Sequence, residues 1–399
     1  ILLTSGSTSA PKAVPTTHKM MCTNQAQLAL ALPFLQDRPP VVVDWLPWNH
    51  VFGGSHNFNA ILANGGSFYI DEGKPTPALI GRTVENLKLQ SGSLAFNVPV
   101  GFALLLKEFD RDPELAKSYF SDLDMMFYAG ASLPQDVWEG FEKYALKYRG
   151  ALPLMTSSWG LTETAPACLM QQEPIRKSGI VGVPLSGTTM KMIPNGDDRY
   201  EIRVKGPNIM TGYLNNPEKT AEAFDEDGYF ITGDAMAFVD AQDPNKGLRF
   251  DGRISEEFKL LTGTWVRAGA LRMDVLAGLV PLATDVVITG ADLSEIGAMI
   301  FPDPGQLSAL GFNGESHDGI VTDANILAVF GEKLTEMQKI SASSSTRIAR
   351  AVVLTEPASM PDGEMTAKGN LNFRKILTRR ADILDHLYQG GQGVITLGK

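Results

Sequence analysis

A loop rich in hydroxyl side chains follows the first apolar residues, and it is the feature that most constrains the fold. Residues 1–3 predict the end of a buried strand, and residues 4–12 read Thr-Ser-Gly-Ser-Thr-Ser-Ala-Pro-Lys. A glycine allows positive φ and close approach of the backbone to a ligand, while hydroxyl, turn N–H and lysine groups suit phosphate oxygens. The candidates for phosphate binding are Thr4, Ser5, Gly6, Ser7, Thr8 and Lys12. A Ser/Thr-rich turn or linker is the alternative, and the loop lacks the Gly-Lys-Ser/Thr of a Walker A motif.

The segments after this loop alternate between strand-like and helix-like patterns. A helix-like run extends from Lys19 to Leu32, and Thr17 can cap its first turn. A later helix-like run, which opens at Leu133-Pro134, places its apolar and aromatic residues on one face, and this spacing predicts a core face: Val137, Phe141, Tyr144, Ala145 and Tyr148. Alternation of this kind predicts a parallel or mixed sheet covered by helices on both sides. Ligands bind such sheets beyond the carboxyl ends of the strands. Two segments are expected at such ends, at residues 129–131 and 157–160.

The sequence pattern changes at about residue 180. Short β-like runs separated by turns predict a β-rich subdomain from about residue 180 to 253. A polar junction, Ile254-Ser255-Glu256-Glu257, follows, and we place a hinge there. Beyond it, the glycine-rich residues 305–319 predict a surface loop, and residues 370–386 predict a single helix. The predicted fold is α/β: a large N-terminal domain of mixed sheets covered by helices (1–253), which includes that subdomain, and a small mobile α+β domain (254–399).

Composition limits the classes of function. The net charge is −10 and no basic stripe stands out, which argues against nucleic-acid binding. No run reaches the roughly 18 apolar residues of a membrane span. Cys22 and Cys168 lie far apart in the sequence and form no metal-binding spacing, so a reduced, cytoplasmic setting is expected. His50 and His56 lie six residues apart, which is a poor spacing for two ligands on one helix face, so a metal site built on them is not expected. The chain begins at Ile1, inside the loop, and we expect it to be an N-terminally truncated fragment.

Four further motifs follow the first loop in order. They are Trp159-Gly160-Leu161-Thr162-Glu163-Thr164, Thr232-Gly233-Asp234, Asp251-Gly252-Arg253 and Thr366-Ala367-Lys368-Gly369-Asn370. With the first loop, they resemble the adenylate-forming superfamily of acyl-CoA synthetases over nearly the whole chain. Within that superfamily, residues 259–266, Lys-Leu-Leu-Thr-Gly-Thr-Trp-Val, look most like the feruloyl-CoA synthetase branch.

The resemblance implies a ligase that forms acyl-AMP from a carboxylic acid and ATP with Mg²⁺, and then transfers the acyl group to CoA. The feruloyl branch favours an aromatic acid such as a hydroxycinnamate. Two alternatives stay open: an acyl-AMP ligase that loads a carrier protein, and a non-catalytic nucleotide-binding remnant. The expected partners are the acid, ATP and CoA, and a homo-oligomer is left open.

The resemblance also implies roles for single residues in the activation step. Negative charge accumulates on phosphate oxygens in that step, so positive and hydrogen-bonding groups are needed. Glu163 suits Mg²⁺ and Thr162 can donate to the α-phosphate; the alternative is an N-cap and a first-turn acid of a helix. Lys368 is the expected lysine of the mobile domain. The nucleotide-binding candidates are Ala131, Gly160, Trp159 (adenine), Asp234 (ribose; otherwise a turn aspartate) and Arg253 (ribose or phosphate).

The remaining candidates concern the acid and CoA. His50 occupies the position where the family has an aromatic or histidine side chain over the substrate carboxylate, and a turn with a satisfied histidine is the alternative. Phe52, Ala129 and Gly130 are expected to border a flat acyl pocket. The hinge and CoA candidates are Ser255, Gly263 and Trp265. Ser9 and Ser255 depart from the family pattern, which usually has a glycine and a charged hinge residue there.

Overall fold

A computed structural model describes residues 1–4, 11–76, 78–130, 133–196, 198–340, 343–365 and 371–398. The chain divides into two compact units, Ile1–Phe250 and Asp251–Lys399. Within the described residues, no helix combines the length and the apolar character needed to span a bilayer.

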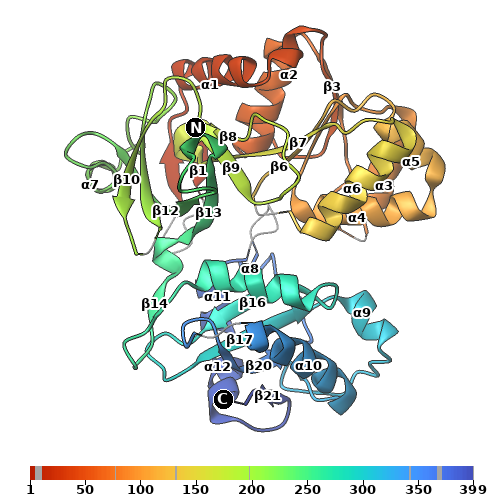
Figure 1. Cartoon of the computed structure of the whole chain (residues 1–399), viewed down its shortest axis with the longest axis vertical. Coiled ribbons are helices and arrows are strands. Elements are labelled where there is room, and N and C mark those ends of the chain that lie inside the picture. Colours follow the sequence, from red (N-terminus) through yellow and green to blue (C-terminus); the bar gives the residue numbers. More distant parts are fainter. Residues whose placement is uncertain are drawn as a thin grey trace. The chain divides into compact units, whose positions relative to one another are not determined.

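An eleven-stranded sheet organises the first unit (Figure 1). Its strands, in sheet order, are β10 (Thr189–Pro194), β11 (Tyr200–Lys205), β12 (Phe230–Phe238), β13 (Leu248–Arg253), β9 (Ile180–Pro184), β8 (Ala167–Met170), β7 (Leu154–Gly160), β6 (Met125–Tyr128), β5 (Leu94–Asn97), β3 (Val41–Asp44) and β4 (Ser67–Ile70). Pairing is parallel from β4 to β7 and antiparallel at β7–β8, β8–β9, β9–β13, β11–β12 and β10–β11. The β-rich segment therefore continues the large sheet.

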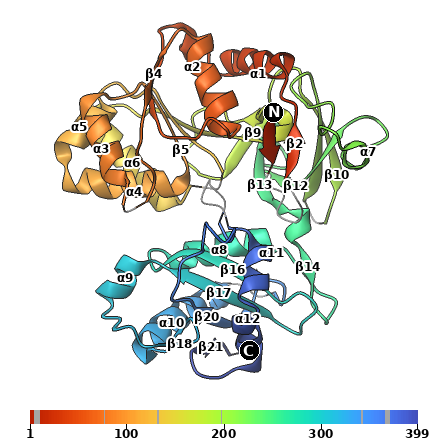
Figure 2. The same ribbon diagram turned by 180° about the vertical axis from the view of Figure 1, so that it is seen from behind.

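Helices cover both faces of the parallel half of this sheet (Figures 1 and 2). One face carries α3 (Ile80–Leu89), α4 (Pro99–Arg111), α5 (Pro113–Phe120) and α6 (Gln135–Tyr148), and the other carries α1 (His18–Ala31) and α2 (Asn59–Ala63). Strand β6 shows the two-residue period that supports this layering. Met126 and Tyr128 belong to the core between the sheet and helices α3 to α6, whereas Met125 and Phe127 belong to the core on the face that carries α1 and α2. The predicted α/β class is confirmed.

Two predictions about the start of the chain have different outcomes. Thr17 caps α1 as expected, because its hydroxyl accepts a hydrogen bond from the backbone N–H of Met20 at 3.2 Å. The expectation of a buried first strand is wrong, since Leu3 is 63% exposed. That strand, β1 (Leu2–Thr4), pairs antiparallel with β2 (Lys12–Val14) in a two-stranded ribbon, which leaves a face open to solvent.

A four-stranded sheet forms the centre of the second unit. Its strands, in order, are β16 (Ala283–Thr289), β17 (Ile296–Pro302), β20 (Ile348–Val353) and β21 (Val394–Thr396). The unit also contains the hairpin β14 (Phe258–Lys259) with β15 (Trp265–Val266), the pair β18 (Ser316–His317) and β19 (Ile320–Val321), and the helices α8 (Ala268–Leu279), α9 (Pro304–Ala309), α10 (Ala324–Ile340), α11 (Phe373–Arg379) and α12 (Ala381–Gln389). The short helix α7 (Pro217–Glu222) belongs to the first unit. Side chains from α8 and α10 share one core, and those from α11 and α12 share another.

The second unit differs from the sequence-based expectation in three places. Helix α8 was not predicted, and the glycine-rich stretch expected to be a surface loop contains α9. The single helix expected over residues 370–386 is two helices that meet at Arg380. The guanidinium of Arg380 bonds the Glu364 carboxylate and the carbonyl oxygens of Glu356 and Pro357, which ties the chain down at that break.

Candidate active site

A hydrogen-bonded chain of three side chains joins distant parts of the first unit. The ammonium group of Lys12 donates to the hydroxyl of Tyr213 at 2.7 Å, and this hydroxyl donates to Oε1 of Glu163 at 2.8 Å. The ammonium nitrogen also lies 4.1 Å from the centroid of the tyrosine ring. The structure therefore places the predicted phosphate-loop lysine and the predicted magnesium ligand at the two ends of this hydrogen-bonded chain, which we call the Lys12–Tyr213–Glu163 relay.

Burial shifts the pKa values of Lys12 and Tyr213 in this relay. Burial lowers the pKa of Lys12, and the nearby charge of Glu163 opposes that effect. Burial, with the charge of Glu163, raises the pKa of Tyr213 far above its usual value. Tyr213 thus stays a neutral hydroxyl that accepts from the lysine and donates to the carboxylate. Sequence reasoning missed Tyr213; the only sequence cue is one tyrosine after a glycine in a loop, fifty residues beyond Glu163.

The turn after β7 fixes Glu163 and Thr162. Any side chain at Gly160 would overlap the carbonyl oxygen of Pro166, so only glycine lets the chain pass here. The following residues form a short 3₁₀ turn, Thr162–Thr164, whose three side chains are buried. The carbonyl oxygen of Glu163 accepts from the backbone N–H of Met210 at 2.8 Å, which anchors this turn to the loop that carries Tyr213.

A second polar pair lies close by on β7 and β12. The indole N–H of Trp159 donates to Oδ2 of Asp234 at 2.8 Å, and both residues are buried. The backbone N–H of Asp234 bonds the hydroxyl of Thr232 at 3.1 Å. The tryptophan packs in the same core as Tyr213. The structure thus brings together the candidates for adenine and ribose, with the indole edge engaged by the aspartate; their ligand roles stay predictions.

Several predicted residues lie outside the described part of the chain. They are Ser5, Gly6, Ser7, Thr8, Ala131 and Lys368. The flanks of the first loop are described: Thr4 ends β1 and faces Lys12 across the ribbon. The Thr4 hydroxyl is buried and has no hydrogen-bond partner among the described residues.

The donor set around Glu163 fits one kind of magnesium site. Within the described ranges, no group of three or more His, Cys, Asp or Glu side chains is placed to hold a metal by itself. Mg²⁺ is commonly held by one or two carboxylates together with substrate phosphates. A single buried carboxylate with a neighbouring threonine hydroxyl suits that arrangement.

The predicted acyl pocket begins at an unusual helical turn after β3. Residues Phe52–Phe58 form a π-helical segment, in which the N–H of His56 bonds the carbonyl oxygen of Val51 at 2.9 Å. A Cβ at Gly53 would lie 2.6 Å from two carbonyl oxygens, so the turn requires a glycine there. The Nδ1 of His50 accepts from the backbone N–H of Phe52 at 3.1 Å. His50 therefore supports the turn locally, and its catalytic role stays a prediction.

A buried polar chain lies behind this turn, and sequence reasoning missed it. Asp44, the last residue of β3, accepts from the Asn57 side-chain amide at 2.7 Å and from the N–H of Leu46 at 3.0 Å. The Asn57 amide oxygen lies 2.9 Å from Nδ1 of His56. Burial raises the pKa of Asp44 to about 7 and lowers that of His56 to about 4. An aspartate that ends a Val-Val-Val run was the sequence cue, because strand ends of this kind border ligand sites.

Aromatic rings surround that histidine on the same side of the sheet. The ring centroid of His56 lies 5.8 Å from Phe52, 5.7 Å from Phe96 and 4.9 Å from Phe127. The strand that carries Phe127 leads into Ala129 and Gly130, and among the described residues a Cβ at Gly130 would meet only a valine methyl group at 3.8 Å. Phe52 thus contacts the buried aromatic cluster, and no described residue fills the space beside Gly130 at the end of β6.

Comparison with known proteins places this geometry in a family. Residues 1–214 match the model of the family described as AMP-binding enzyme. The chain belongs to the AMP-binding enzyme family. It is 25% identical over 278 residues to "Probable acyl-activating enzyme 16, chloroplastic" of Arabidopsis thaliana, covering 65% of this chain and 37% of that protein. It is 27% identical over 304 residues to "Probable 4-coumarate--CoA ligase 2" of Dictyostelium discoideum, covering 74% and 52%.

A third relative has a different acceptor in its name. The "Long-chain-fatty-acid--[acyl-carrier-protein] ligase AEE15, chloroplastic" of Arabidopsis thaliana is 23% identical over 273 residues, covering 65% of this chain and 35% of that protein. This AMP-binding enzyme chain therefore spans about a third to a half of the length of these curated relatives.

Solved structures of low identity share the fold. The O-succinylbenzoate coenzyme A synthetase of Bacillus subtilis, in complex with AMP, has a TM-score of 0.69 at 20% identity, covering 94% of this chain and 67% of that one. The A domain of a carboxylic acid reductase from Segniliparus rugosus, in complex with AMP and a co-purified carboxylic acid, has a TM-score of 0.73 at 20% identity, covering 96% and 60%. These likenesses concern the mixed α/β architecture.

The second unit of this AMP-binding enzyme carries the other predicted residues. Arg253 ends β13, and Ser255 is exposed in the short 3₁₀ turn Ile254–Glu256. Gly263 has a φ of 86° at the tip of the β14–β15 hairpin, where its N–H bonds the carbonyl oxygen of Leu260. Trp265 is 61% exposed. The hairpin therefore presents an exposed indole next to a glycine, as a loop for contact with a ligand would; the roles in CoA binding and hinge motion stay predictions.

The described residues on either side of 366–370 are tied together. Met365 and Leu371 form an antiparallel bridge, and the N–H of Asn372 bonds the carbonyl oxygen of Glu364 at 2.7 Å. The Glu364 side chain is fully buried and accepts from Arg380, Arg379 and the N–H of Ser359. The two ends of the segment that contains Lys368 are thus held to each other and to α11.

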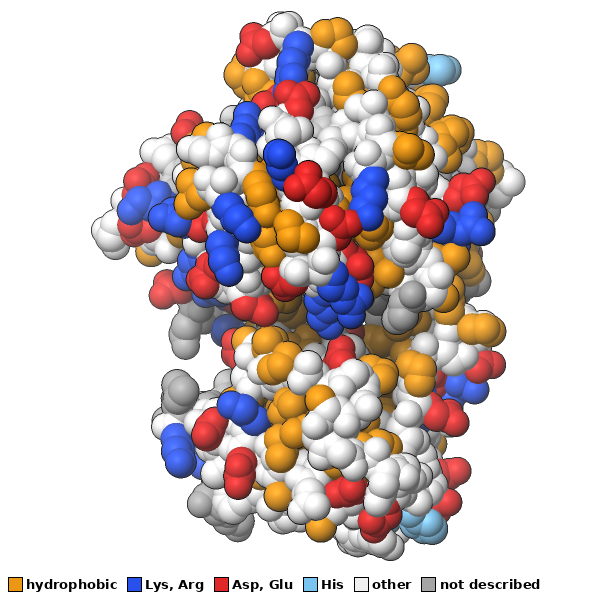
Figure 3. Space-filling model, turned by 90° about the vertical axis from the view of Figure 1, so that its right-hand side faces the viewer, with side chains coloured by type: hydrophobic (Ala, Val, Ile, Leu, Met, Phe, Trp, Pro, Cys, Tyr) orange, Lys and Arg blue, Asp and Glu red, His pale blue; other side chains and the backbone are white. Residues whose placement is uncertain are grey.

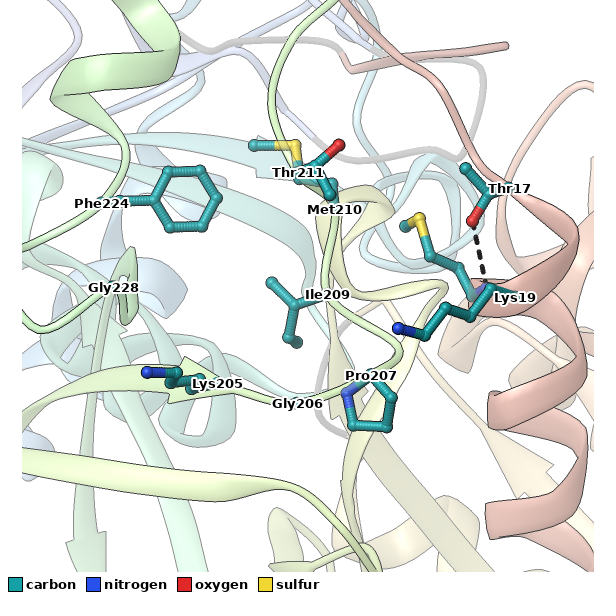
Figure 4. Close-up of a pocket in the computed structure, with 11 residues that line it drawn as sticks. Thr17, Lys19, Lys205, Gly206, Pro207, Ile209, Met210, Thr211, Phe224 and Gly228 are labelled. Atoms are coloured by element: carbon teal, nitrogen blue, oxygen red, sulfur yellow. Dashed lines mark hydrogen bonds between the residues drawn. The ribbon is translucent and has the colours of Figure 1, made fainter.

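A pocket of about 230 Å³ lies beside the N-terminus of α1 (Figure 4). Lys19 of α1 and Lys205 of β11 line it together with Ile209 and Phe224, and the ammonium group of Lys205 donates to the carbonyl oxygen of Asp227. None of its lining residues was predicted as a site residue. Elsewhere on the surface, acidic and basic side chains are interspersed over the face drawn in Figure 3.

Proposed function

We propose that this AMP-binding enzyme is an AMP-forming carboxylic acid–CoA ligase that activates an aromatic acid, such as ferulate or a related hydroxycinnamate. The observation that carries the proposal is the Lys12–Tyr213–Glu163 relay, which joins two motifs that lie 151 positions apart. A cation and a metal-binding carboxylate on one relay are the groups that phosphoryl chemistry requires. The coumarate–CoA ligase relative supports the choice of acid and acceptor.

The residues of the first unit have separate tasks in this reaction. Lys12 neutralises the leaving pyrophosphate, and Thr162 donates to an oxygen of the α-phosphate. Glu163 would hold Mg²⁺ together with the nucleotide phosphates, and a bound ion would supply positive charge against the charge that develops on those oxygens. Asp234 accepts from the ribose hydroxyls, and its bond from Trp159 orients the carboxylate for that task.

The first test is acid-dependent release of pyrophosphate from ATP by the full chain. We expect release with hydroxycinnamates, and a thioester when CoA is added. Replacing Lys12 by alanine should lower the rate of release about 10²-fold, as removal of a transition-state charge contact does elsewhere. ATP binding without any turnover in the presence of aromatic, short-chain or long-chain acids would favour the nucleotide-binding remnant instead.

The acceptor is tested separately, because one relative is named for an acyl-carrier protein. CoA and a carrier protein with a pantetheine arm are offered to enzyme that already holds acyl-AMP. Thioester formation with CoA supports the proposal. Transfer only to the carrier protein would make the chain a carrier-loading ligase.

The two half-reactions also test the proposed division of labour between the units. Lys368→Ala should lower acyl-AMP formation about 10²-fold and leave thioester formation from supplied acyl-AMP unchanged. Gly263→Phe should do the reverse, because a bulky side chain at a φ of 86° both strains the hairpin and blocks the approach of a pantetheine arm. Equal slowing of both steps by both substitutions would contradict domain alternation.

A further inference from the structure

The buried imidazole of His56 ends a hydrogen-bonded chain and offers a single acceptor. Its Nδ1 faces the amide oxygen of Asn57, whose amide nitrogen is already used toward Asp44. That oxygen can only accept, so Nδ1 must carry the proton of the neutral ring. Nε2 then keeps its lone pair, and it has no hydrogen-bond partner among the described residues.

The surroundings of Nε2 select among ligands. His56 is 2% exposed, and the rings of Phe52, Phe96 and Phe127 pack around it. A neutral acceptor in an apolar shell disfavours an anion, and an alkyl chain would leave the acceptor unpaired. A planar ring with a hydroxyl group satisfies both the aromatic shell and the lone pair.

The position in the fold points to a ligand site. Asp44 ends β3, and Phe96 and Phe127 lie near the carboxyl ends of the adjacent parallel strands β5 and β6. Ligands of open α/β sheets bind beyond such ends. His56 itself stands on the π-helical segment, a type of turn that is frequent at functional sites.

We propose that His56 determines the specificity for hydroxylated aromatic acids, because its Nε2 accepts a hydrogen bond from a hydroxyl group on the substrate ring. The proposal rests on the proposed function, since it assigns this aromatic cluster to the acid. Phe52 lies on the same π-helical turn and packs against the imidazole, so the proposal requires the Phe52 ring to rotate aside when the substrate reaches Nε2. A methoxy group at that ring position would be rejected, because it brings no proton to donate.

The test compares three acids that differ at one ring position: 4-hydroxycinnamate, cinnamate and 4-methoxycinnamate. The readout is kcat/KM for acid-dependent pyrophosphate release by the full chain. The unmodified enzyme should favour the hydroxylated acid over cinnamate by about 10² or more, as sites built to bond a hydroxyl do. His56→Leu should bring that ratio to within about threefold while it keeps turnover of cinnamate, and His56→Gln should restore part of it through its amide oxygen.

Tyr119→Phe is the matched control. The Tyr119 hydroxyl is also buried without a hydrogen-bond partner among the described residues, but it packs in the core on the other face of the sheet. This substitution should leave the ratio unchanged. Equal kcat/KM for hydroxycinnamate and cinnamate in the unmodified enzyme would overturn the role of His56 and leave the aromatic-acid ligase intact. Turnover of palmitate or acetate alone would instead overturn the aromatic acid of the proposed function.

A binding measurement covers the case in which no acid is turned over. The ¹⁵N resonance of the His56 Nε2 is assigned by its loss in His56→Leu, and each acid is then added to the labelled chain. 4-Hydroxycinnamate should shift that resonance and cinnamate should not. The absence of a shift with 4-hydroxycinnamate would overturn the proposal.

Discussion

Each of the two units buries a carboxylate, and they hold it in opposite ways. In the first unit, Asp44 receives hydrogen bonds from the Asn57 amide and a backbone N–H, and burial raises its pKa to about 7. In the second unit, Glu364 is paired with two arginines, and the hydrogen bond from Arg380 is the main cause that lowers its pKa to about 2. The first acid is about half protonated near pH 7, whereas the second stays charged until the pH falls toward 2.

The difference separates a structural carboxylate from one that orients the imidazole that we propose binds the acid. Cations around Glu364 fix three segments of the chain, and that arrangement favours rigidity over chemistry. Asp44 fixes the Asn57 amide through a hydrogen bond, and the amide oxygen in turn orients the imidazole of His56. Burial alone therefore says little about the use of an acid; the charge of its partners decides.

The largest expected effect is loss of stability in the second unit. Glu364→Gln leaves Arg379 and Arg380 without their counter-charge, and we expect the free energy of unfolding to fall by about 3–5 kcal/mol. Asp44→Asn is the matched substitution in the first unit, and it should cost less than about 1 kcal/mol because no cation loses its partner. Urea unfolding of both variants measures this. Similar losses in the two variants would break the comparison.

The second prediction is that the two acids give opposite pH dependences. The pKa of Glu364 lies below its usual 4.5, so its contribution is complete above that pH and disappears as the pH falls toward 2. The pKa of Asp44 lies above its usual 3.8, so stability is lost as the pH rises from about 4 to 7. Each change is on the order of 3 kcal/mol. Unfolding curves from pH 2 to 8 check this, and Asp44→Asn should remove only the slope between pH 4 and 7.

The smallest effect concerns a third acid that lies between these extremes. Glu163 receives its bond from a neutral hydroxyl, with the ammonium group of Lys12 behind it. Tyr213→Phe removes the link, and we expect pyrophosphate release to slow about 10- to 100-fold, since one hydrogen bond to a charged group is lost. Stability should change by less than about 1 kcal/mol. An unchanged rate would mean that Lys12 and Glu163 act independently, and Tyr119→Phe again serves as the control.

The sequence predicted what depends on neighbours along the chain. Strand and helix alternation, the Thr17 cap and the core face of α6 follow from local patterns, and the structure has all three. The order of the motifs predicted Lys12, Glu163 and Asp234 as candidate site residues. Tyr213 was not predicted, because its contact with Glu163 forms only when two loops of the fold meet.

Other misses have equally physical causes. A π-helical segment has more residues per turn than an α-helix, which changes the direction in which His56 points, and no hydrophobic periodicity of an α-helix or strand predicts that rotation. His50 drew attention instead, although its Nδ1 is used within the turn. The break between α11 and α12 depends on Arg380 being captured by Glu364, and the exposure of Leu3 depends on which strands pair with β1.

The glycine-pinned turn at Gly53 has a consequence for how such a protein diverges in evolution. Its backbone rests against the carbonyl groups of Leu46 and Pro47, so it cannot move without disturbing the end of β3. Side chains at positions 52 and 56 can change by single mutations while the main chain keeps its course. Under the proposed function, descendants of one ancestor can therefore come to accept different acids at this turn without a change of fold.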